Sequence, residues 1–438
     1  MSHLFSLPTL PGPVLGILGS IWAVWEAVWW IATPLIAIII FWEAWRLHLL
    51  HKWVHHIHWT MLEIKVPKNI LKTPKAMEQI FAAAHAPYSY GYSWFQKYIQ
   101  GMDEYWMSFE LIGRAGETHF YLRVPNEYRN MMESAIYGQY PDAEISEAND
   151  YLDEMPKIIP NRTFDLSGFE EVQRHAPYFP IRTYPMFEES VEEQRIDPIA
   201  GLMEVMSKLK EGEQIWYQVL VRPTGEDAFN AGKKELNKMY GVEEPKKKGI
   251  FGDFDLGFGM EDVIRAPFQH PGERNSKKDE KDRFPRLLLS PHDKERGDAI
   301  QQKIAKLSFD ATVRFVVITE RDLATPDSGY IMSLHGFMRQ FNTQNLQQLK
   351  PEKSTTTAGY AVKGLFKKPR LHWRKRLLYE NYKNILHGKP VAILNIEELA
   401  TIFHFPLGTV STTELEKVGS RKGSPPASLP VIEEAELQ

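Results

Sequence analysis

MSFELIGRAGETHFYLRVP (107–125) carries the clearest structural pattern in the chain. Apolar and polar residues alternate on both sides of the connection GRAG (113–116), with Phe109 and Leu111 before it and Phe120 after it on one side. A period of two is typical of a strand that buries one face, and a short glycine-rich connection is typical of a hairpin. The segment therefore predicts a β-hairpin with one face in the core.

Strand and helix patterns on both sides extend this hairpin into a larger unit. MLEIKVP (61–67) predicts a strand, and Pro74 opens the helix that follows it. After the hairpin, residues 126–138 predict a second helix and residues 143–145 a short strand. The order strand, helix, strand, strand, helix, strand is that of a ferredoxin-like sandwich. We expect such a module at residues 59–155.

A similar order recurs from about Ile181 to Leu349, and we expect residues 156–350 to form a second ferredoxin-like module. EQIWYQVLVR (213–222) and ATVRFVVIT (311–319) read as buried strands. Between them, residues 225–294 are rich in Lys, Asp, Glu, Gly and Pro, and bury too little apolar surface to offset the entropy of ordering. The sequence thus predicts an α+β chain with two tandem modules and a long mobile insertion.

Residues 351–438 form a separate C-terminal segment with a Pro-rich, acidic tail. Within VAILNIEELATIFHFP (391–406), Glu397 and Glu398 fall in the first turn of a predicted helix, where negative charge favours the helix dipole. His404 lies among apolar residues and is expected to be packed. The segment opens with a run of basic residues: Lys367, Lys368, Arg370, Arg374, Lys375 and Arg376.

An apolar stretch near the N-terminus predicts a membrane anchor at residues 1–58. Between residues 14 and 42 the only ionisable residue is Glu26. About 20 apolar residues cross a hydrocarbon core of ~30 Å, so the stretch is long enough for one helix. We place the core of the span at 29–50. Because a charge in mid-bilayer is costly, Glu26 is expected at the membrane interface, with a helix–helix contact as the alternative.

Charge asymmetry predicts the orientation of this anchor. Lys and Arg are absent before the apolar stretch, so it lacks the basic start of a cleaved signal peptide, and a small-residue cleavage site is missing too. Positive residues are retained on the cytoplasmic side. We therefore expect a single-pass protein of the inner or plasma membrane, with its N-terminus outside and its bulk in the cytoplasm. The basic residues after the span are Arg46, Lys52, Lys65, Lys68, Lys72 and Lys75.

Five histidines follow the span closely: His48, His51, His55, His56 and His58. Their spacings place several on one side of a helix, where imidazoles can bind a metal. The alternative is an aromatic, weakly basic collar at the membrane surface. No nearby carboxylate completes a metal site, which favours the collar.

Composition and missing motifs argue against several classes of chemistry. The 438 residues carry 52 basic and 56 acidic side chains, a formal charge of −4, so there is no global nucleic-acid signature. The chain has no cysteine, which excludes disulfides, thiolate nucleophiles and cysteine-ligated metals. GSRKGS (419–424) lacks the spacing of a phosphate-binding loop, and hydrolase and zinc-protease motifs are missing. We expect a non-enzymatic protein without a cofactor.

Two surfaces are candidates for interaction. The outward side of the predicted hairpin forms a mixed polar and aromatic face, suited either to stacking single-stranded nucleic acid or to packing against the second module or another subunit. It carries Ser108, Glu110, His119, Tyr121 and Arg123. The basic run at 367–376 includes Trp373 and is suited to DNA, anionic lipid or solvent. A second copy of the chain is a further expected partner.

Several blocks of the chain resemble the membrane-anchored N-terminal region of bacterial type IV secretion or conjugation-like DNA-translocase ATPases. They are LEIKVPKN (62–69), TPKAMEQIFAA (73–83), SFELIGRAGETHFYLRVPNEYRNMMESAIYGQYPDAEI (108–145), DPIAGLMEVMSKLKEGEQIWYQVLVRP (197–223) and LNIEELATIFHFP (394–406). In that family an ATPase core follows the segment that corresponds to 418–430, whereas this chain stops at Gln438. The resemblance implies the membrane and assembly role without the motor.

Two functions are therefore expected, in this order. The first is a non-enzymatic component of a type IV secretion-like translocation complex that docks in trans on a separately encoded ATPase. The alternative is a membrane-tethered scaffold that binds lipid or single-stranded nucleic acid through the basic run at 367–376.

Overall fold

The computed structural model describes residues 12–67, 72–89, 91–187, 197–241, 290–323, 328–357, 362, 364 and 366–406. The chain divides into two compact units. The first comprises Met1–His58 and Gly91–Asp103, and the second comprises Trp59–Tyr90 and Glu104–Gln438. The α+β class and the N-terminal apolar helix that the sequence predicts are confirmed.

The first unit consists of a long helix and a short helical segment. Helix α1 (Gly12–His56) is the first described element of the chain and contains Pro34. The short segment η1 (Gln96–Gln100) is a π-helix that ends at Gly101, whose φ is 76°. Although the sequence separates them by 40 residues or more, the two elements belong to the same unit because η1 packs on α1.

The first half of the second unit alternates strands and helices. Its elements are β1 (Trp59–Lys65), α2 (Lys75–Ala84), β2 (Met107–Arg114), β3 (Glu117–Pro125), η2 (Asn126–Tyr128), α3 (Arg129–Gln139) and β4 (Glu144–Glu147). Strands β2 and β3 pair antiparallel, as the sequence predicts. The turn between them uses only Ala115 and Gly116, both with positive φ, which suits the right-handed twist of a hairpin.

The second half repeats this order and carries an insertion. Its elements are η3 (Tyr151–Glu154), β5 (Phe164–Gln173), η4 (Tyr184–Met186), α4 (Ala200–Ser207), β6 (Glu213–Pro223), α5 (Asp227–Met239), α7 (Pro291–Ile304), β7 (Ser308–Glu320), α8 (Ser328–Arg339) and β8 (Leu349–Pro351). The chain continues through α9 (Lys367–Lys383), β9 (Ala392–Asn395) and α10 (Ile396–Ile402). The first strand of this half, β5, lies upstream of the position at which the sequence pattern begins to repeat.

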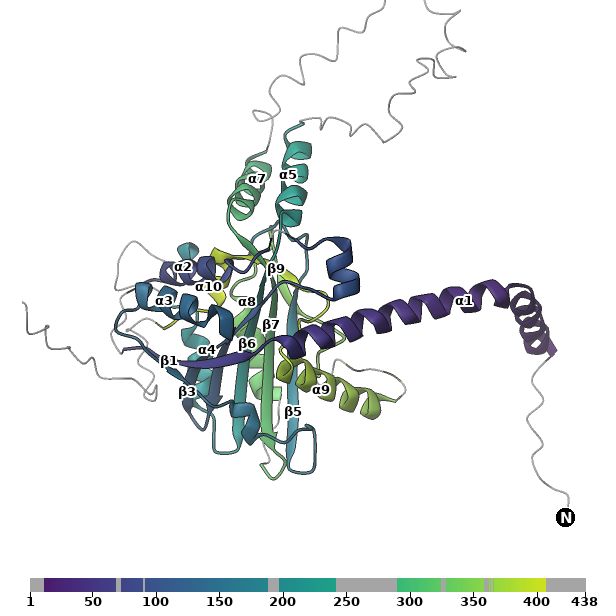
Figure 1. Cartoon of the computed structure of the whole chain (residues 1–438), viewed down its shortest axis with the longest axis horizontal. Coiled ribbons are helices and arrows are strands. Elements are labelled where there is room, and N and C mark those ends of the chain that lie inside the picture. The colour runs from purple at the N-terminus through teal and green to yellow at the C-terminus, as the bar shows by residue number, and fades with distance from the viewer. Residues whose placement is uncertain are drawn as a thin grey trace, which may run out of the picture. The chain divides into compact units, whose positions relative to one another are not determined.

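The nine described strands form one antiparallel sheet, in the order β4-β1-β3-β2-β6-β7-β5-β8 with β9 beside β7. Figure 1 shows β1, β3, β5, β6 and β7 in this sheet. Numbered within each half, the strands follow the order 4-1-3-2 and then its mirror image, 2-3-1-4. The halves join where β2 pairs with β6, with Glu110 opposite Gln218. The long strand β7 pairs with β5 along Val313–Glu320 and with β9 along Ser308–Ala311. A continuous ladder of backbone hydrogen bonds therefore connects the two halves.

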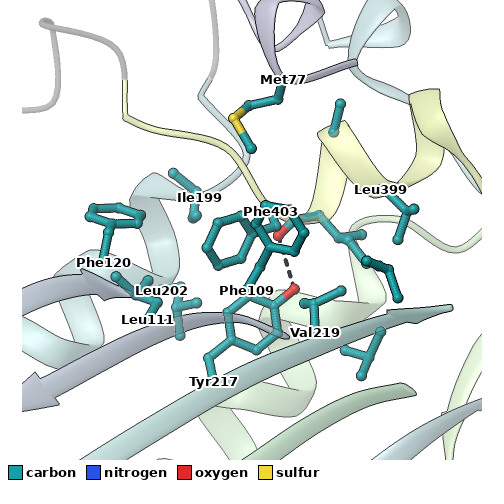
Figure 2. Packing of buried hydrophobic residues seen from close by; sticks show 14 of the residues in the cluster. Met77, Phe109, Leu111, Phe120, Ile199, Leu202, Tyr217, Val219, Leu399 and Phe403 are labelled. Atoms are coloured by element: carbon teal, nitrogen blue, oxygen red, sulfur yellow. Dashed lines mark hydrogen bonds between the residues drawn. The ribbon is translucent and has the colours of Figure 1, made fainter. Parts of the chain in front are cut away.

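Helices α2, α3, α4, α8 and α10 bury one face of this sheet in the main hydrophobic core. Figure 2 shows Tyr217 of β6 and Phe109 of β2 packed against Leu399 and Phe403 at α10. The Tyr217 hydroxyl donates a hydrogen bond of 2.9 Å to the carbonyl of Ile402. The C-terminal segment is thus an integral part of the core, and His404 is packed there, as expected from the sequence.

The insertion predicted as a mobile loop at 225–294 is partly helical. Helix α5 and the start of α7 lie within it and extend side by side from the sheet (Figure 1). The sequence prediction overlooked the contact between these two helices. Because Gly232 of α5 has no side chain, Ile300 and Ile304 of α7 pack closely against α5 at this position. Leu236 is buried in the same small cluster. Residues 242–289 of the predicted loop lie outside the described residues.

Candidate functional site

Helix α1 presents an apolar surface that the described residues of its unit leave uncovered. From Trp25 to His56 it is long and apolar enough to cross a membrane, and no part of its most apolar window is buried. Ile38 and Phe41 are each about two-thirds exposed, at 66% and 64%. Such a continuous apolar surface needs lipid or another protein to cover it. Among the described residues, this is the one helix with that property.

The histidines at the end of α1 contact neighbouring aromatic side chains and one another. His51 and His55 stack with ring centroids 4.0 Å apart, and the Nδ1 atom of His55 lies 2.9 Å from the carbonyl oxygen of His51. Within the described residues, no three His, Asp or Glu side chains come together in a way that could hold a metal ion. The other ring contacts are those of His48 with Trp45 and of His56 with Trp53.

The hairpin residues predicted to face away from the core lie on the opposite face of the sheet, where a second cluster is found. Arg123 is buried and forms a bidentate pair with Asp150, with 2.7 Å between Nη2 and Oδ1. His119 lies 2.9 Å from Glu63 and stacks on the half-buried Tyr121. The structure thus brings all three candidates together, but Arg123 is engaged inside the chain.

Glu110 is the centre of a fully satisfied polar network on this face. Its carboxylate accepts hydrogen bonds from Arg123 at 3.1 Å, Ser108 at 2.6 Å, Gln218 at 3.0 Å and the Tyr151 hydroxyl at 2.7 Å. Burial raises the pKa of Tyr151 well above its usual range, and the nearby Glu110 carboxylate adds a smaller effect in the same direction. The phenol therefore stays protonated and remains a donor to the buried carboxylate.

Arg314 of β7 extends the network across the second half. Its guanidinium donates to Glu170 at 2.7 Å, to Gln218 at 2.6 Å, and to the carbonyls of Asn381 at 3.2 Å and Leu386 at 2.8 Å. Gln218 also donates to Glu110, so a chain of hydrogen bonds crosses the joint between the two halves. Because the buried charges are paired and bonded, the network holds the halves in register rather than exposing reactive groups.

Helix α9 closes this face of the sheet. Tyr382 contacts Trp216 of β6, with ring centroids 5.0 Å apart, and its hydroxyl lies 2.7 Å from that of Tyr151. Gly168 of β5 makes the close approach possible, because a Cβ there would lie 2.8 Å from Leu378 of α9. The polar network is therefore sealed between the sheet and α9.

The predicted basic run lies on α9 and divides into two sets. Arg374 donates to the carbonyl of Thr356 at 3.1 Å, and Lys375 forms an ion pair of 2.8 Å with Asp165. The remaining members are exposed, as is Trp373, which lies among them. These exposed members are Lys367, Lys368, Arg370 and Arg376.

A groove of about 920 Å³ opens at the outer edge of the second half, between the ends of β5 and α8 and strand β8. Glu171 lies on its floor, buried, with no hydrogen-bond partner for Oε2 in the described part of the chain. Its other oxygen lies 3.9 Å from His335. The basic residues of the groove are Arg174, Arg339, Lys350 and Lys353. This arrangement suits an anionic ligand, and the acidic floor provides a group that can give or take a proton.

Sequence reasoning placed Ser108, Glu110 and Arg123 on one face of the hairpin but did not predict that they form a buried network, and it did not single out the groove. Two signals point to them. A lone arginine inside the apolar strand ATVRFVVIT (311–319) requires a buried acidic partner. The acidic pair in GFEEVQ (168–173) is the corresponding signal on β5, where Glu170 faces Arg314 and Glu171 points to the other side.

Comparison with known families now assigns the chain. The family described as Domain of unknown function (DUF8128) matches residues 53–417. The chain belongs to the DUF8128 family. The match begins near the end of α1 and includes both halves of the sheet, α9 and α10, so the DUF8128 region contains the buried network and the groove. A comparison with curated proteins finds no match.

Glu171 gives the DUF8128 fold a specific pH dependence. Burial raises the pKa of this carboxyl in the folded protein, more than His335 and Arg339 lower it. Its contribution to stability is therefore fully present below the ordinary pKa of glutamate and is lost as the pH rises through the raised pKa. We expect Glu171→Gln to stabilise the protein by about 1 kcal/mol at pH 8 and to have no effect near pH 4.

Urea unfolding of the detergent-solubilised protein across this pH range measures the difference. Glu211→Gln, at an exposed glutamate, is the matched control and should follow the wild type at every pH. A constant difference between Glu171→Gln and wild type from pH 4 to pH 8 would contradict the expectation.

Proposed function

We propose that this DUF8128 protein is anchored in the inner or plasma membrane by α1, with its N-terminus outside and the sheet in the cytoplasm. The support for the anchor is the uncovered apolar surface from Trp25 to His56. The support for the orientation is that positive residues follow this surface and none precede it.

We also propose that the two halves of the sheet are tandem ferredoxin-like modules. Each half has the order strand, helix, strand, strand, helix, strand, and each has the spatial strand order 4-1-3-2 when read from its outer edge. This connectivity is the one expected for that fold. Joined through β2 and β6, the modules make one rigid body rather than two that move independently.

The function that fits best is that of a non-enzymatic component of a type IV secretion-like translocation complex, which docks on an ATPase encoded separately. The observation that carries this proposal is the combination of an exposed apolar helix with a continuous sheet in which the buried arginines Arg123 and Arg314 are paired with carboxylates of the same chain. The blocks that resemble the front region of DNA-translocase ATPases point in the same direction.

A second candidate rests on α9. Four of its basic residues are exposed around Trp373, which is 62% exposed, and this surface suits an anionic partner such as lipid headgroups or single-stranded nucleic acid. This second candidate predicts that binding to the anionic partner weakens as the salt concentration is raised. Flotation with anionic vesicles and filter binding with single-stranded DNA distinguish the two ligands.

Affinity capture from the cells that encode the protein tests the first candidate. After crosslinking in intact membranes, we expect a phosphate-loop ATPase to be enriched with the full-length protein. The control is a variant with the four exposed basic residues of α9 changed to serine, which should still capture the ATPase. Repeated capture without any ATPase would contradict the proposal, and a partner lost only in the control variant would favour the second candidate.

A further inference from the structure

The segment Gly91–Asp103 belongs to the unit of α1, although it lies between two strands of the sheet in sequence. The indole Nε1 of Trp45 donates a hydrogen bond of 2.8 Å to the carbonyl of Tyr98, and the rings of Trp42 and Tyr98 lie 5.5 Å apart. Gly101 approaches Leu49 so closely that a Cβ there would lie 3.0 Å from Leu49 Cδ2. The segment is therefore fixed to α1 along residues 42–49.

The segment has its own local order. Ser93 and Gln96 exchange hydrogen bonds, with the Ser93 amide donating to the Gln96 side chain at 2.9 Å and the Gln96 amide donating to Ser93 Oγ at 3.3 Å. This reciprocal arrangement is that of a capping box and starts the helical turn. Gly101 ends the turn in the left-handed conformation. The segment is thus a defined short helix between a start and a stop signal.

Its apolar residues lie at positions 94, 95, 98 and 99, a spacing that places them along one side of a helical turn. Trp94, Phe95 and Ile99 are 63%, 56% and 46% exposed. Polar residues, including the exposed Lys97 and Gln100, occupy the positions between and after them. Outside α1 and this segment, the exposed large apolar side chains of the described chain, such as Met332, are isolated along the sequence, which is ordinary for a protein surface.

We propose that Gly91–Asp103 is a membrane-binding segment that lies in the headgroup region of the bilayer crossed by α1. The inference rests on the membrane anchor of the proposed function. Its apolar side is continuous with the exposed apolar surface of α1, because it is fixed at Trp42 and Trp45. These residues adjoin Glu43 and Arg46, the first charges after the apolar stretch. We therefore place the boundary between lipid tails and headgroups at this level, several residues before residue 50, where the sequence prediction ended the span.

The chemistry of the segment fits that level of a membrane. Tryptophan and tyrosine are favoured at the membrane–water boundary because their rings are apolar with a polar edge. A short amphipathic helix there buries its apolar side about 5–10 Å into the boundary and leaves Lys97 at the phosphates. The segment gives the anchor a second contact with lipid, and this contact limits tilting of α1.

Single-cysteine spin labels test the proposal directly, because the native chain has no cysteine. The full-length protein is placed in vesicles of phosphatidylcholine and phosphatidylglycerol, and collision with oxygen is compared with collision with an aqueous nickel chelate. Labels replace Phe95 and Ile99 on the apolar side and Gln100 on the polar side. Ile38 on α1 serves as the lipid control, and Met332 on α8 serves as the water control.

We expect the ratio of oxygen to nickel collisions at 95 and 99 to be several-fold higher than at 100 and at 332. If 95 and 99 match 332 while 38 reports lipid, the segment does not enter the membrane and the anchor stands. If 38 also matches 332, the anchor itself is wrong. A segment covered by a second copy of the chain would shield 95 and 99 from both reagents, which also overturns the proposal.

Discussion

Replacing Arg314 by leucine is expected to lower the free energy of unfolding by about 3–5 kcal/mol. The guanidinium is fully buried and donates to Glu170, Gln218 and two backbone carbonyls. Its removal leaves the Glu170 carboxylate buried without its cation and several acceptors without a donor. The loss of one partner from a buried pair costs far more than the pair itself contributes.

Urea unfolding of the solubilised protein measures this cost. Lys208→Leu is the matched control, since Lys208 forms an exposed ion pair with Glu204 on a helix surface and its loss should change little. Adding Glu170→Gln to Arg314→Leu removes the uncompensated charge and should restore part of the lost stability. An Arg314→Leu protein as stable as the control would show that the network does not hold the halves together.

Replacing both Ile38 and Ile39 by arginine is expected to release most of the protein from the membrane. Both residues lie in the exposed apolar run of α1. Arginine near the middle of a spanning helix costs about 2.5–3.5 kcal/mol on insertion scales, so the two changes together cost roughly 6 kcal/mol. We expect this cost to outweigh most of the favourable free energy of inserting a single helix into the bilayer.

Alkaline extraction of membranes followed by ultracentrifugation measures the released fraction. The control Ile38→Leu with Ile39→Leu keeps the helix apolar and should stay in the pellet. Circular dichroism of the released variant checks that the sheet is intact, which separates loss of the anchor from loss of folding. Retention of the arginine variant in the pellet would mean that another surface holds the protein on the membrane.

Local patterns in the sequence were sufficient for much of the fold. The hairpin at 107–125 follows from alternation on both sides of GRAG (113–116), although only Ala115 and Gly116 form the turn. Strands β6 and β7 follow from long apolar runs. Helix α10 follows from the acidic pair Glu397 and Glu398 in its first turn, and the structure adds a capping box between Asn395 and Glu398. In each case the deciding interactions are between residues close in sequence.

Features that depend on distant partners escaped prediction. Strand β5 (FDLSGFEEVQ) carries acidic and small residues that look unlike a central strand, and only Arg314 and α9 explain them. Helix α9 is dominated by charged residues, so its buried stripe of Leu378, Tyr379 and Tyr382 is inconspicuous. The joint between β2 and β6 leaves no local signal, because pairing of strands from different modules is set by tertiary structure.

The residues predicted to form interaction surfaces also have tertiary partners that the sequence did not reveal. Alternation put His119, Tyr121 and Arg123 on the side away from the main core, but could not reveal that this side is covered as well, with Asp150 and Tyr151 against Arg123. The segment Gly91–Asp103 lacks a long periodic pattern, and its importance follows only from its contacts with α1. Periodicity identifies a face, whereas its partner comes from the tertiary fold.

Crossing of the membrane by α1, with the sheet on the inner side, is tested most directly by cysteine labelling in intact cells. Because the chain has no cysteine, single cysteines at Ser2 and Met332 report only their own locations. A membrane-impermeant maleimide should label position 2 in intact cells and position 332 only after lysis. Labelling of position 332 in intact cells, or recovery of the full-length protein in the soluble fraction, would contradict this topology.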